Sequence, residues 1–295
     1  MTTIGMVGLG NMGSGVASNL LKSGYELIAW NRSPGPVEEL VAKGARRAGS
    51  PSEAFDAEVV FSMLSEDSVI EAVIVNSGAL DGARAGAVHV NLSTISVSLA
   101  RRLEALHQAR GLGYVAAPVL GRPDVAASGG LVVLAAGAPA AVETVLPLLE
   151  RFGRKVWRMG DEAARANVVK LACNFALASM IETLGEAGAL AAAHGVEPRD
   201  VYDVMTEGLF ASPAYKVYAE LIGEQRFSPA GFAMPLGLKD VRLALQAGEE
   251  KHAPMPIASV LRDQFIAALA HGDAELDWSA LAMVSRRAAG LERPS

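Results

Sequence analysis

The sequence opens with Thr3-Ile4-Gly5-Met6-Val7-Gly8-Leu9-Gly10-Asn11-Met12-Gly13, in which a short apolar run leads into a GxGxxG pattern. A segment with helical character, from Ser14 to Lys22, follows directly. In such a layout Gly8 permits a tight turn, Gly10 lets the backbone approach a pyrophosphate, and Gly13 lets the helix pack against the strand. The alternative is a structural turn that binds no ligand. The order of strand, glycine loop and helix favours a dinucleotide site, formed by Gly8, Leu9, Gly10, Asn11, Met12 and Gly13.

The end of the second expected strand narrows the choice of cofactor. The strand Glu26–Trp30 runs into Asn31, Arg32 and Ser33, at the position where an NAD site usually carries an acidic residue for the ribose hydroxyls. A neutral amide, a fixed cation and a hydroxyl donor suit a 2′-phosphate better than a free hydroxyl. We therefore expect NADP as the cofactor. The other interpretation of Arg32 is a solvated arginine in a loop.

Composition indicates a globular protein with room for two domains. The chain has 295 residues, of which 51% are hydrophobic and 20% charged, enough for a large core. Its net charge of −6 and its dispersed cations argue against nucleic acid as a partner. The single Cys173 excludes an internal disulfide, and the five histidines lack the spacing of metal ligands. Without a signal segment or a long apolar run, we expect a cytoplasmic protein that binds a small molecule and neither metal nor membrane.

The first half of the chain alternates between strand and helix patterns, and the second half is helical. The alternation predicts an α/β fold with a doubly wound parallel sheet. A long Ala-rich helix follows, and prolines then divide the remainder into shorter helices. We expect a dinucleotide-binding domain over 1–161, an interdomain helix over 162–194 and an all-helical domain over 195–295. The expected strands are Ile4–Val7, Glu26–Trp30, Val59–Met63, Ala87–Asn91, Gly113–Ala116, Leu131–Ala135 and Lys155–Arg158.

The long helix carries two polar residues on an apolar surface. Between Val168 and Ala178, only Lys170 and Asn174 are polar, and their spacing of four places them on one face. A buried ammonium is costly unless it reaches water or has a function. Lys170 is therefore either a structural lysine or a proton donor to a reacting carbonyl oxygen, with Asn174 holding the substrate or the lysine.

Taken together, the motifs resemble those of the β-hydroxyacid dehydrogenase family, which includes 3-hydroxyisobutyrate dehydrogenases and glyoxylate and succinic semialdehyde reductases. The resemblance covers nearly the whole chain, and the motifs occur in the family's order. They are GLGNMG at Gly8–Gly13, AWNRS at Ala29–Ser33, Met63-Leu64, NLSTIS at Asn91–Ser96, APVLG at Ala117–Gly121, Lys170 with Asn174, and Leu238-Lys239-Asp240.

The resemblance implies roles for individual positions. In the family, the segment matching Ser93-Thr94 lies beside the nicotinamide and the substrate. The lysine matching Lys170 is catalytic, the asparagine matching Asn174 supports it, and the lysine matching Lys239 lies near the cofactor. Asp240 is interpreted as a local cap or pair. The resemblance also implies a Rossmann domain followed by a helical domain, Met63 and Leu64 among the cofactor residues, and assembly as a homodimer or homotetramer.

Three departures from the family pattern bear on the substrate. Leu120-Gly121-Arg122 replaces the Ser-Gly pair that usually holds a carboxylate, so the pocket becomes more apolar. The amides of Leu120 and Gly121 would still bind an oxyanion, and Arg122 is either a bidentate carboxylate ligand or a surface arginine. In addition, Ala164 and Ala166 replace glycines, and Cys173 replaces a second asparagine.

These observations favour an NADPH-dependent oxidoreductase that reduces a small aldehyde acid or ketone, with Lys170 as general acid, Ser93 and Asn174 orienting the substrate, and Gly121 with Arg122 addressing its carboxylate. One alternative is an imine reductase, which the apolar Leu120 favours and Lys170 disfavours. Another is a cofactor-binding protein without catalysis. The sequence leaves open the physiological substrate and the favoured direction of reaction.

Overall fold

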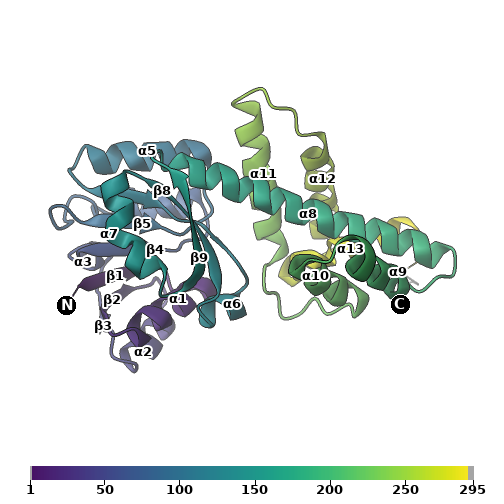
Figure 1. Ribbon diagram of the computed structural model, residues 1–295, viewed down its shortest axis with the longest axis horizontal. Helices are drawn as coiled ribbons and strands as arrows, with labels where there is room; N and C mark the ends of the chain where they lie inside the picture. Colours follow the sequence, from purple (N-terminus) through teal and green to yellow (C-terminus); the bar gives the residue numbers. More distant parts are fainter. Residues whose placement is uncertain (1, 292–295) are drawn as a thin grey trace. The chain divides into compact units, whose positions relative to one another are not determined.

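The computed structural model describes residues 2–291 of the chain. It divides into two compact units, residues 1–170 and 171–295, and the division falls inside the helix α8 (Ala164–Ala193). The first unit is an α/β unit and the second is helical (Figure 1).

The first unit is built on a nine-stranded sheet with the order β3-β2-β1-β4-β5-β6-β8-β7, and β9 pairs with β8. From β3 to β6 every pairing is parallel. The expected strands are therefore present, and β3 and β7 are two short additions. The strands are β1 (Thr3–Val7), β2 (Glu26–Trp30), β3 (Arg46–Arg47), β4 (Val59–Ser62), β5 (Val88–Asn91), β6 (Gly113–Ala116), β7 (Val119–Leu120), β8 (Leu131–Gly137) and β9 (Gly153–Gly160).

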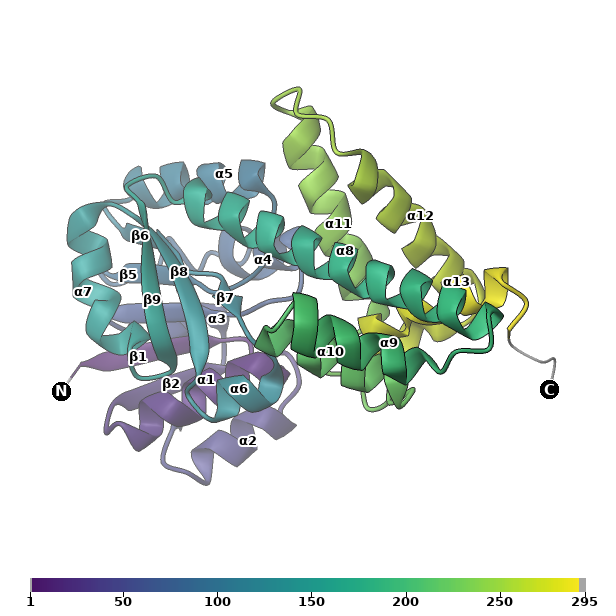
Figure 2. The same ribbon diagram turned by 45° about the vertical axis from the view of Figure 1, so that its right-hand side comes forward.

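Helices cover both faces of this sheet (Figure 2). Side chains of α1, α2, α6 and α7 pack into one apolar cluster with alternate strand residues such as Ile4, Met6 and Val90. The intervening strand residues face the other side, where Gly5 lies against the backbone of α3 and His89 bonds to α5. The helices are α1 (Asn11–Lys22), α2 (Gly35–Val41), α3 (Pro51–Ala54), α4 (Asp67–Ile70), α5 (Val97–Gln108), α6 (Pro123–Ala127) and α7 (Pro139–Leu149), with the π-helical turn η1 (Glu71–Val75) after α4.

The carboxyl ends of the parallel strands lie in register. Trp30, Val7, Ser62, Asn91 and Ala116 are successive neighbours across β2, β1, β4, β5 and β6, and each is the last residue of its strand. The loops that follow these strands therefore leave the sheet along a single edge. In open α/β sheets this is the edge at which ligands bind.

The strands at the β7 end of the sheet do not all pair in parallel, which differs from the parallel sheet expected from the sequence. β8 pairs antiparallel with both β6 and β7. Only two residues separate β6 from β7, and the link from β7 to β8 contains just the five-residue α6. A parallel connection needs a crossover of about a dozen residues, usually through a longer helix. The chain therefore returns beside β6 and β7 as in a hairpin.

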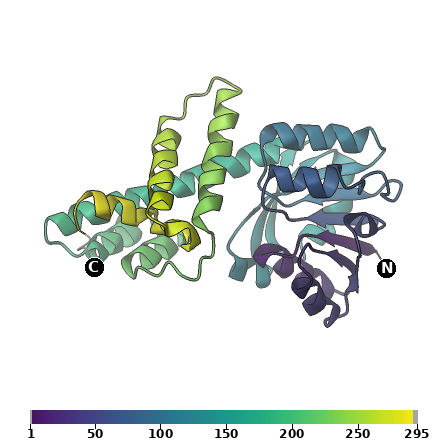
Figure 3. The ribbon, with the colours of Figure 1, turned by 180° about the vertical axis from the view of Figure 1, so that it is seen from behind.

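Up to residue 291, the second unit contains helices and no strands, apart from one isolated bridge between Ala233 and Asp277. Its core joins apolar residues of α8, α10, α11 and α12 around Trp278, whose indole N–H donates to the Tyr218 hydroxyl at 2.8 Å. All three views show α11 and α12 side by side and joined by a loop (Figure 3). The elements are α9 (Pro198–Val204), η2 (Met205–Leu209), α10 (Pro213–Gly223), α11 (Met234–Glu249), α12 (Pro256–Ala270), η3 (Asp273–Glu275), η4 (Trp278–Leu281) and α13 (Ala282–Ala288).

The helix α8 matches the long helix expected from the Ala-rich segment. By length and composition alone it is long and apolar enough to cross a membrane, and half of its most apolar stretch is buried inside the protein. Core helices of soluble proteins share this property, so the observation is weak as a sign of membrane insertion.

A buried hydrogen-bond chain lies beneath α5 on the sheet. The Nδ1 atom of His107 is 2.6 Å from the Leu103 carbonyl, so Nδ1 carries the hydrogen and donates it. The Nε2 atom of His107 then accepts from Nδ1 of His89 at 2.9 Å, and Nε2 of His89 accepts from the Ser62 hydroxyl at 2.7 Å. Both imidazoles are neutral in this arrangement. Burial lowers the pKa of His107 from 6.5 to about 4, and burial followed by the nearby His107 lowers the pKa of His89 well below 6.5.

We expect these two buried histidines to make the stability of the protein depend on pH. Between pH 6.5 and pH 4 the unfolded chain protonates its histidines while folded His107 stays neutral, so the free energy of unfolding falls as the pH falls. His107 alone contributes on the order of 3 kcal/mol over this window, at about 1.4 kcal/mol per pKa unit. Urea unfolding at several pH values measures this slope. A His107→Gln variant should show a shallower slope, and equal slopes would contradict the assignment.

Candidate functional site

The glycine loop after β1 has room for a ligand on one side only. Gly8 has a φ of +96°, and a Cβ there would lie 2.3 Å from the Met63 carbonyl oxygen. A Cβ on Gly13 would lie 2.2 Å from the Gly8 carbonyl oxygen, whereas one on Gly10 would meet nothing within 4 Å. Gly8 and Gly13 are therefore required by packing, and Gly10 faces open space. Gly10 also caps α1 without any side-chain hydrogen bond, which leaves the first amides of α1 open to an anion.

The end of β2 is tied to this loop. The Oδ1 atom of Asn31 accepts a hydrogen bond from the Leu9 amide at 2.9 Å, and its Nδ2 donates to the Ser33 carbonyl at 3.0 Å. Asn31 therefore fixes the glycine loop against the loop after β2. Arg32 and Ser33 are exposed, and Arg32 makes no ion pair with any residue of the described part of the chain.

The loops after β4 and β5 are joined through Ser93. Its hydroxyl oxygen accepts from the Leu64 amide at 2.8 Å, and its own amide donates to Asn91 Oδ1 at 2.9 Å. Ser93 is only 2% exposed. The structure thus brings together two of the sequence-predicted segments, Met63-Leu64 and Ser93-Thr94, and the Ser93 hydroxyl hydrogen remains able to donate.

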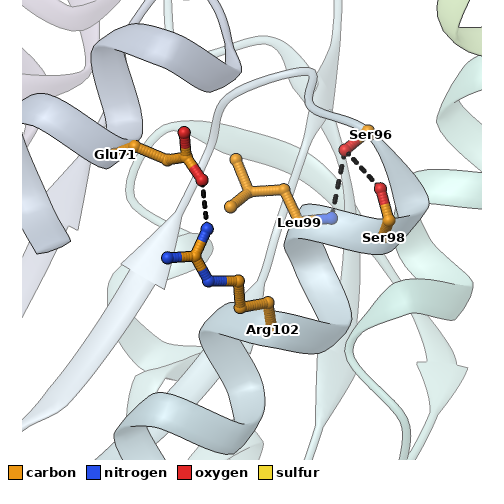
Figure 4. Close-up of polar contacts among 5 residues, drawn as sticks. All are labelled: Glu71, Ser96, Ser98, Leu99 and Arg102. Atoms are coloured by element: carbon orange, nitrogen blue, oxygen red, sulfur yellow. Dashed lines mark hydrogen bonds and ion pairs between the residues drawn. The ribbon is translucent and has the colours of Figure 1, made fainter.

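A second set of contacts holds the same two loops further along the chain (Figure 4). Ser96 caps α5 by accepting from the Leu99 amide at 3.0 Å, while its own amide donates to Asp67 Oδ1 at 3.0 Å. One turn later on α5, Arg102 forms an ion pair with Glu71 of η1. These contacts fix the start of α5, and with it the loop that carries Ser93.

The segment Leu120-Gly121-Arg122 ends β7 and leads into α6. Gly121 has a φ of +144°, and a Cβ there would lie 2.6 Å from Leu131 Cδ2. Leu120 and Arg122 are half-buried. Gly121 is therefore required by both backbone conformation and packing.

In the second unit, Asn174 belongs to a buried polar group. Its Nδ2 donates to Asp240 Oδ2 at 2.5 Å, and the other oxygen of Asp240 lies 3.1 Å from the Lys239 ammonium. Asn174 is 5% exposed and Asp240 is 3% exposed. One helical turn before Asn174, Lys170 is 8% exposed. The expected local pair of Asp240 is present, because its carboxylate pairs with the adjacent Lys239, and the same carboxylate also binds Asn174, which lies 66 positions away in the chain.

Comparison with known proteins identifies the family. Residues 3–160 match the model for the NAD-binding domain of 6-phosphogluconate dehydrogenase, and residues 164–285 match the model described as the NAD-binding domain of NADP-dependent 3-hydroxyisobutyrate dehydrogenase. The chain belongs to the 3-hydroxyisobutyrate dehydrogenase family. Members of this family are NAD(P)-dependent oxidoreductases that act on CH–OH groups.

Three similar proteins match along almost their whole length. An uncharacterized oxidoreductase of Bacillus subtilis, YfjR, is 39% identical over 94% of this chain and 98% of its own. Glyoxylate/succinic semialdehyde reductase 1 of Arabidopsis thaliana is 30% identical over 94% of this chain and 96% of its own. The structure of Mycobacterium tuberculosis 3-hydroxyisobutyrate dehydrogenase with L-serine superposes with a TM-score of 0.88 at 30% identity, covering 97% of this chain and 99% of that one.

The residues of the first unit fit the dinucleotide that the family implies. The open space over Gly10 and the uncapped start of α1 would receive the pyrophosphate. The loop after β2 would receive the adenosine ribose, and the Met63-Leu64 and Ser93-Thr94 segments would lie towards the nicotinamide. The shared edge of the strands brings these loops together, and the resemblance to the family implies which part of the dinucleotide each would receive.

Sequence reasoning did not single out Asp67 or Ser96. Ser96 precedes an apolar helical segment and has the residue type of an N-cap, which was a usable signal. Asp67 gave none, because nothing local indicates that its carboxylate accepts an amide 29 positions away.

Proposed function

We propose that this protein is an NADPH-dependent reductase of a small aldehyde acid or ketone, yielding the hydroxy acid or alcohol, with Lys170 as general acid. The observation that carries the proposal is a buried lysine one helical turn from an asparagine that a buried carboxylate holds in place. In an oxidoreductase, such a lysine suits proton transfer to the oxygen that gains charge.

The proposed mechanism assigns one role to each residue. Bound NADPH supplies the hydride for the carbonyl carbon. Lys170 donates a proton from its ammonium to the carbonyl oxygen, and Asn174, held by Asp240, fixes the position of the reacting group. The Ser93 hydroxyl donates a hydrogen bond to the substrate, while the Ser93 oxygen itself accepts a hydrogen bond from the Leu64 amide. Gly121 and Arg122 address the substrate carboxylate, beside an apolar wall at Leu120.

The preference for NADPH rests on the loop after β2. Asn31 is already engaged by the glycine loop, and no carboxylate follows β2 to bind the ribose hydroxyls. Arg32 is exposed and has no ion-pair partner among the described residues. An exposed guanidinium that is not engaged in an ion pair is well suited to a 2′-phosphate, to which it can donate two parallel hydrogen bonds.

We expect NADPH to have a kcat/KM at least about tenfold above that of NADH, because a charge-assisted phosphate contact is worth more than about 1.4 kcal/mol. Steady-state kinetics with both cofactors measures the ratio. Arg32→Ala should remove most of the difference. Equal or better use of NADH by the unaltered protein would reject the assignment.

If Lys170 is the general acid, Lys170→Ala should lower kcat by roughly 10²- to 10⁴-fold and leave NADPH affinity nearly unchanged. Lys170→Arg should restore little, because a guanidinium stays charged and gives up no proton. A panel of glyoxylate, succinic semialdehyde, methylmalonate semialdehyde and a cyclic imine supplies the substrate for these assays. Melting temperatures of the same samples provide the control, since a structural lysine would lower Tm while preserving turnover.

We further propose that the protein is a cytoplasmic homodimer or homotetramer that binds neither nucleic acid nor membranes. Most of the exposed large apolar side chains that the structure describes lie in the second unit, and Leu190, Val204 and Leu209 are 65%, 65% and 71% exposed. Large apolar side chains that are this exposed would be buried by a contact with another subunit.

Light scattering at micromolar concentration should therefore give the mass of a dimer or tetramer rather than the 30.7 kDa of one chain. Leu209→Glu should shift the mass towards the monomer, because it puts a charge in place of an exposed apolar side chain of the proposed contact. An exposed apolar residue of the first unit, Val41, offers a matched control in Val41→Glu. A wild-type monomer would contradict the proposal.

A further inference from the structure

A buried amide near the start of α8 has an acceptor without a partner. Asn167 is 2% exposed. Its Oδ1 atom is buried and accepts no hydrogen bond from any residue in the described range. Buried side-chain amides in native proteins are nearly always hydrogen-bonded, so each exception calls for an explanation.

The position of Asn167 connects it with Lys170. The two residues are three apart on α8, and Asn174 follows four residues after Lys170, so all three lie on one face of the helix. Every other residue from Ala166 to Ala178 is apolar. This stretch of the helix therefore presents a single polar row, with the proposed proton donor at its centre.

Other buried amides of the protein are satisfied by the protein itself. Asn91 accepts from the Ser93 amide, and Asn174 donates to Asp240. Asn167 differs, because the protein provides no donor for its oxygen. An apolar side chain of similar volume would cost less at this position than an unsatisfied amide. This cost is offset if the donor comes from a bound ligand.

We propose that Asn167 is a ligand-contact residue whose Oδ1 accepts a hydrogen bond from an N–H or O–H donor of the bound ligand. The donor is either the carboxamide N–H of the nicotinamide or a polar group of the substrate. Asn167 as acceptor and Lys170 as donor then offer a ligand both kinds of hydrogen bond from one helix face. The inference rests on the proposed function, because it needs a ligand at this row.

Asn167→Leu removes the acceptor and keeps the volume, and Asn167→Ala serves as a second variant in case leucine fails to pack. We expect either the dissociation constant for NADPH, measured by fluorescence titration, or the KM of the substrate at saturating NADPH to rise about 10- to 100-fold, because the ligand donor is left unpaired. The Tm of the ligand-free variant should stay equal or rise. A change in NADPH affinity identifies the carboxamide as the donor, and a change in KM alone identifies the substrate.

Glu182→Gln provides a matched control on the same helix. Glu182 is 6% exposed, and its Oε2 atom is also without a hydrogen-bond partner in the described part of the chain. Its Oε1 accepts from Gln264 and Ser285, within the helical unit. This variant should alter Tm and leave both binding constants unchanged.

The outcomes separate the inference from the function on which it rests. If the wild type binds NADPH and both Asn167 variants keep its affinity and the substrate KM within twofold, Asn167 is a packing or water-binding residue and the inference is wrong. If the wild type binds neither NADPH nor NADH, the proposed function fails and the inference fails with it.

Discussion

The common register of five strand ends is the constraint on which the nucleotide-binding half of the site depends. Trp30, Val7, Ser62, Asn91 and Ala116 are neighbours in one row, and the backbone ladder continues beyond it, with Gly8 donating to Trp30, Met63 to Val7 and Leu92 to Ser62. A slip of one residue in any strand would turn its side chains to the opposite face. The alternation of strand side chains between the two faces of the sheet fixes this register, and therefore also fixes where each loop leaves the sheet.

Polar contacts then refine what the sheet positions. Asn31 binds the glycine loop, Ser93 joins the loops after β4 and β5, and Asp67 holds the amide of Ser96. Each of these side chains accepts a hydrogen bond from a backbone amide, and the Ser93 hydroxyl keeps its hydrogen for donation. In the helical unit the partners are side chains rather than backbone amides, because Asp240 binds the side chains of Asn174 and Lys239. A buried carboxylate between a donor amide and an ammonium holds both at the cost of their mobility.

Much of the fold could be predicted because its signals are local. Alternating strand and helix patterns, the glycine loop and the long apolar helix are each visible within a short window, and the family motifs extend this to the proposed site residues. The antiparallel return of β8 was missed because it depends on the shortness of α6 rather than on any strand pattern. The bonds of Asp67 to Ser96 and of Asp240 to Asn174 were missed because these partners are 29 and 66 positions away. One sequence cannot show which distant residues meet.

The polar row on α8 shows how local rules fail where function is expected. Asn167, Lys170 and Asn174 each oppose the apolar character of their helix, and their burial cannot be attributed to helix formation, since Leu or Ala would serve it better. Asn174 has a protein partner in Asp240, whereas the Asn167 oxygen has none in the described residues. Consistency between local preference and fold is the general condition for a stable protein, and departures from it concentrate at functional sites. The physical character of α8 thus points to the same residues as the family motif, and it adds one that the motif does not include.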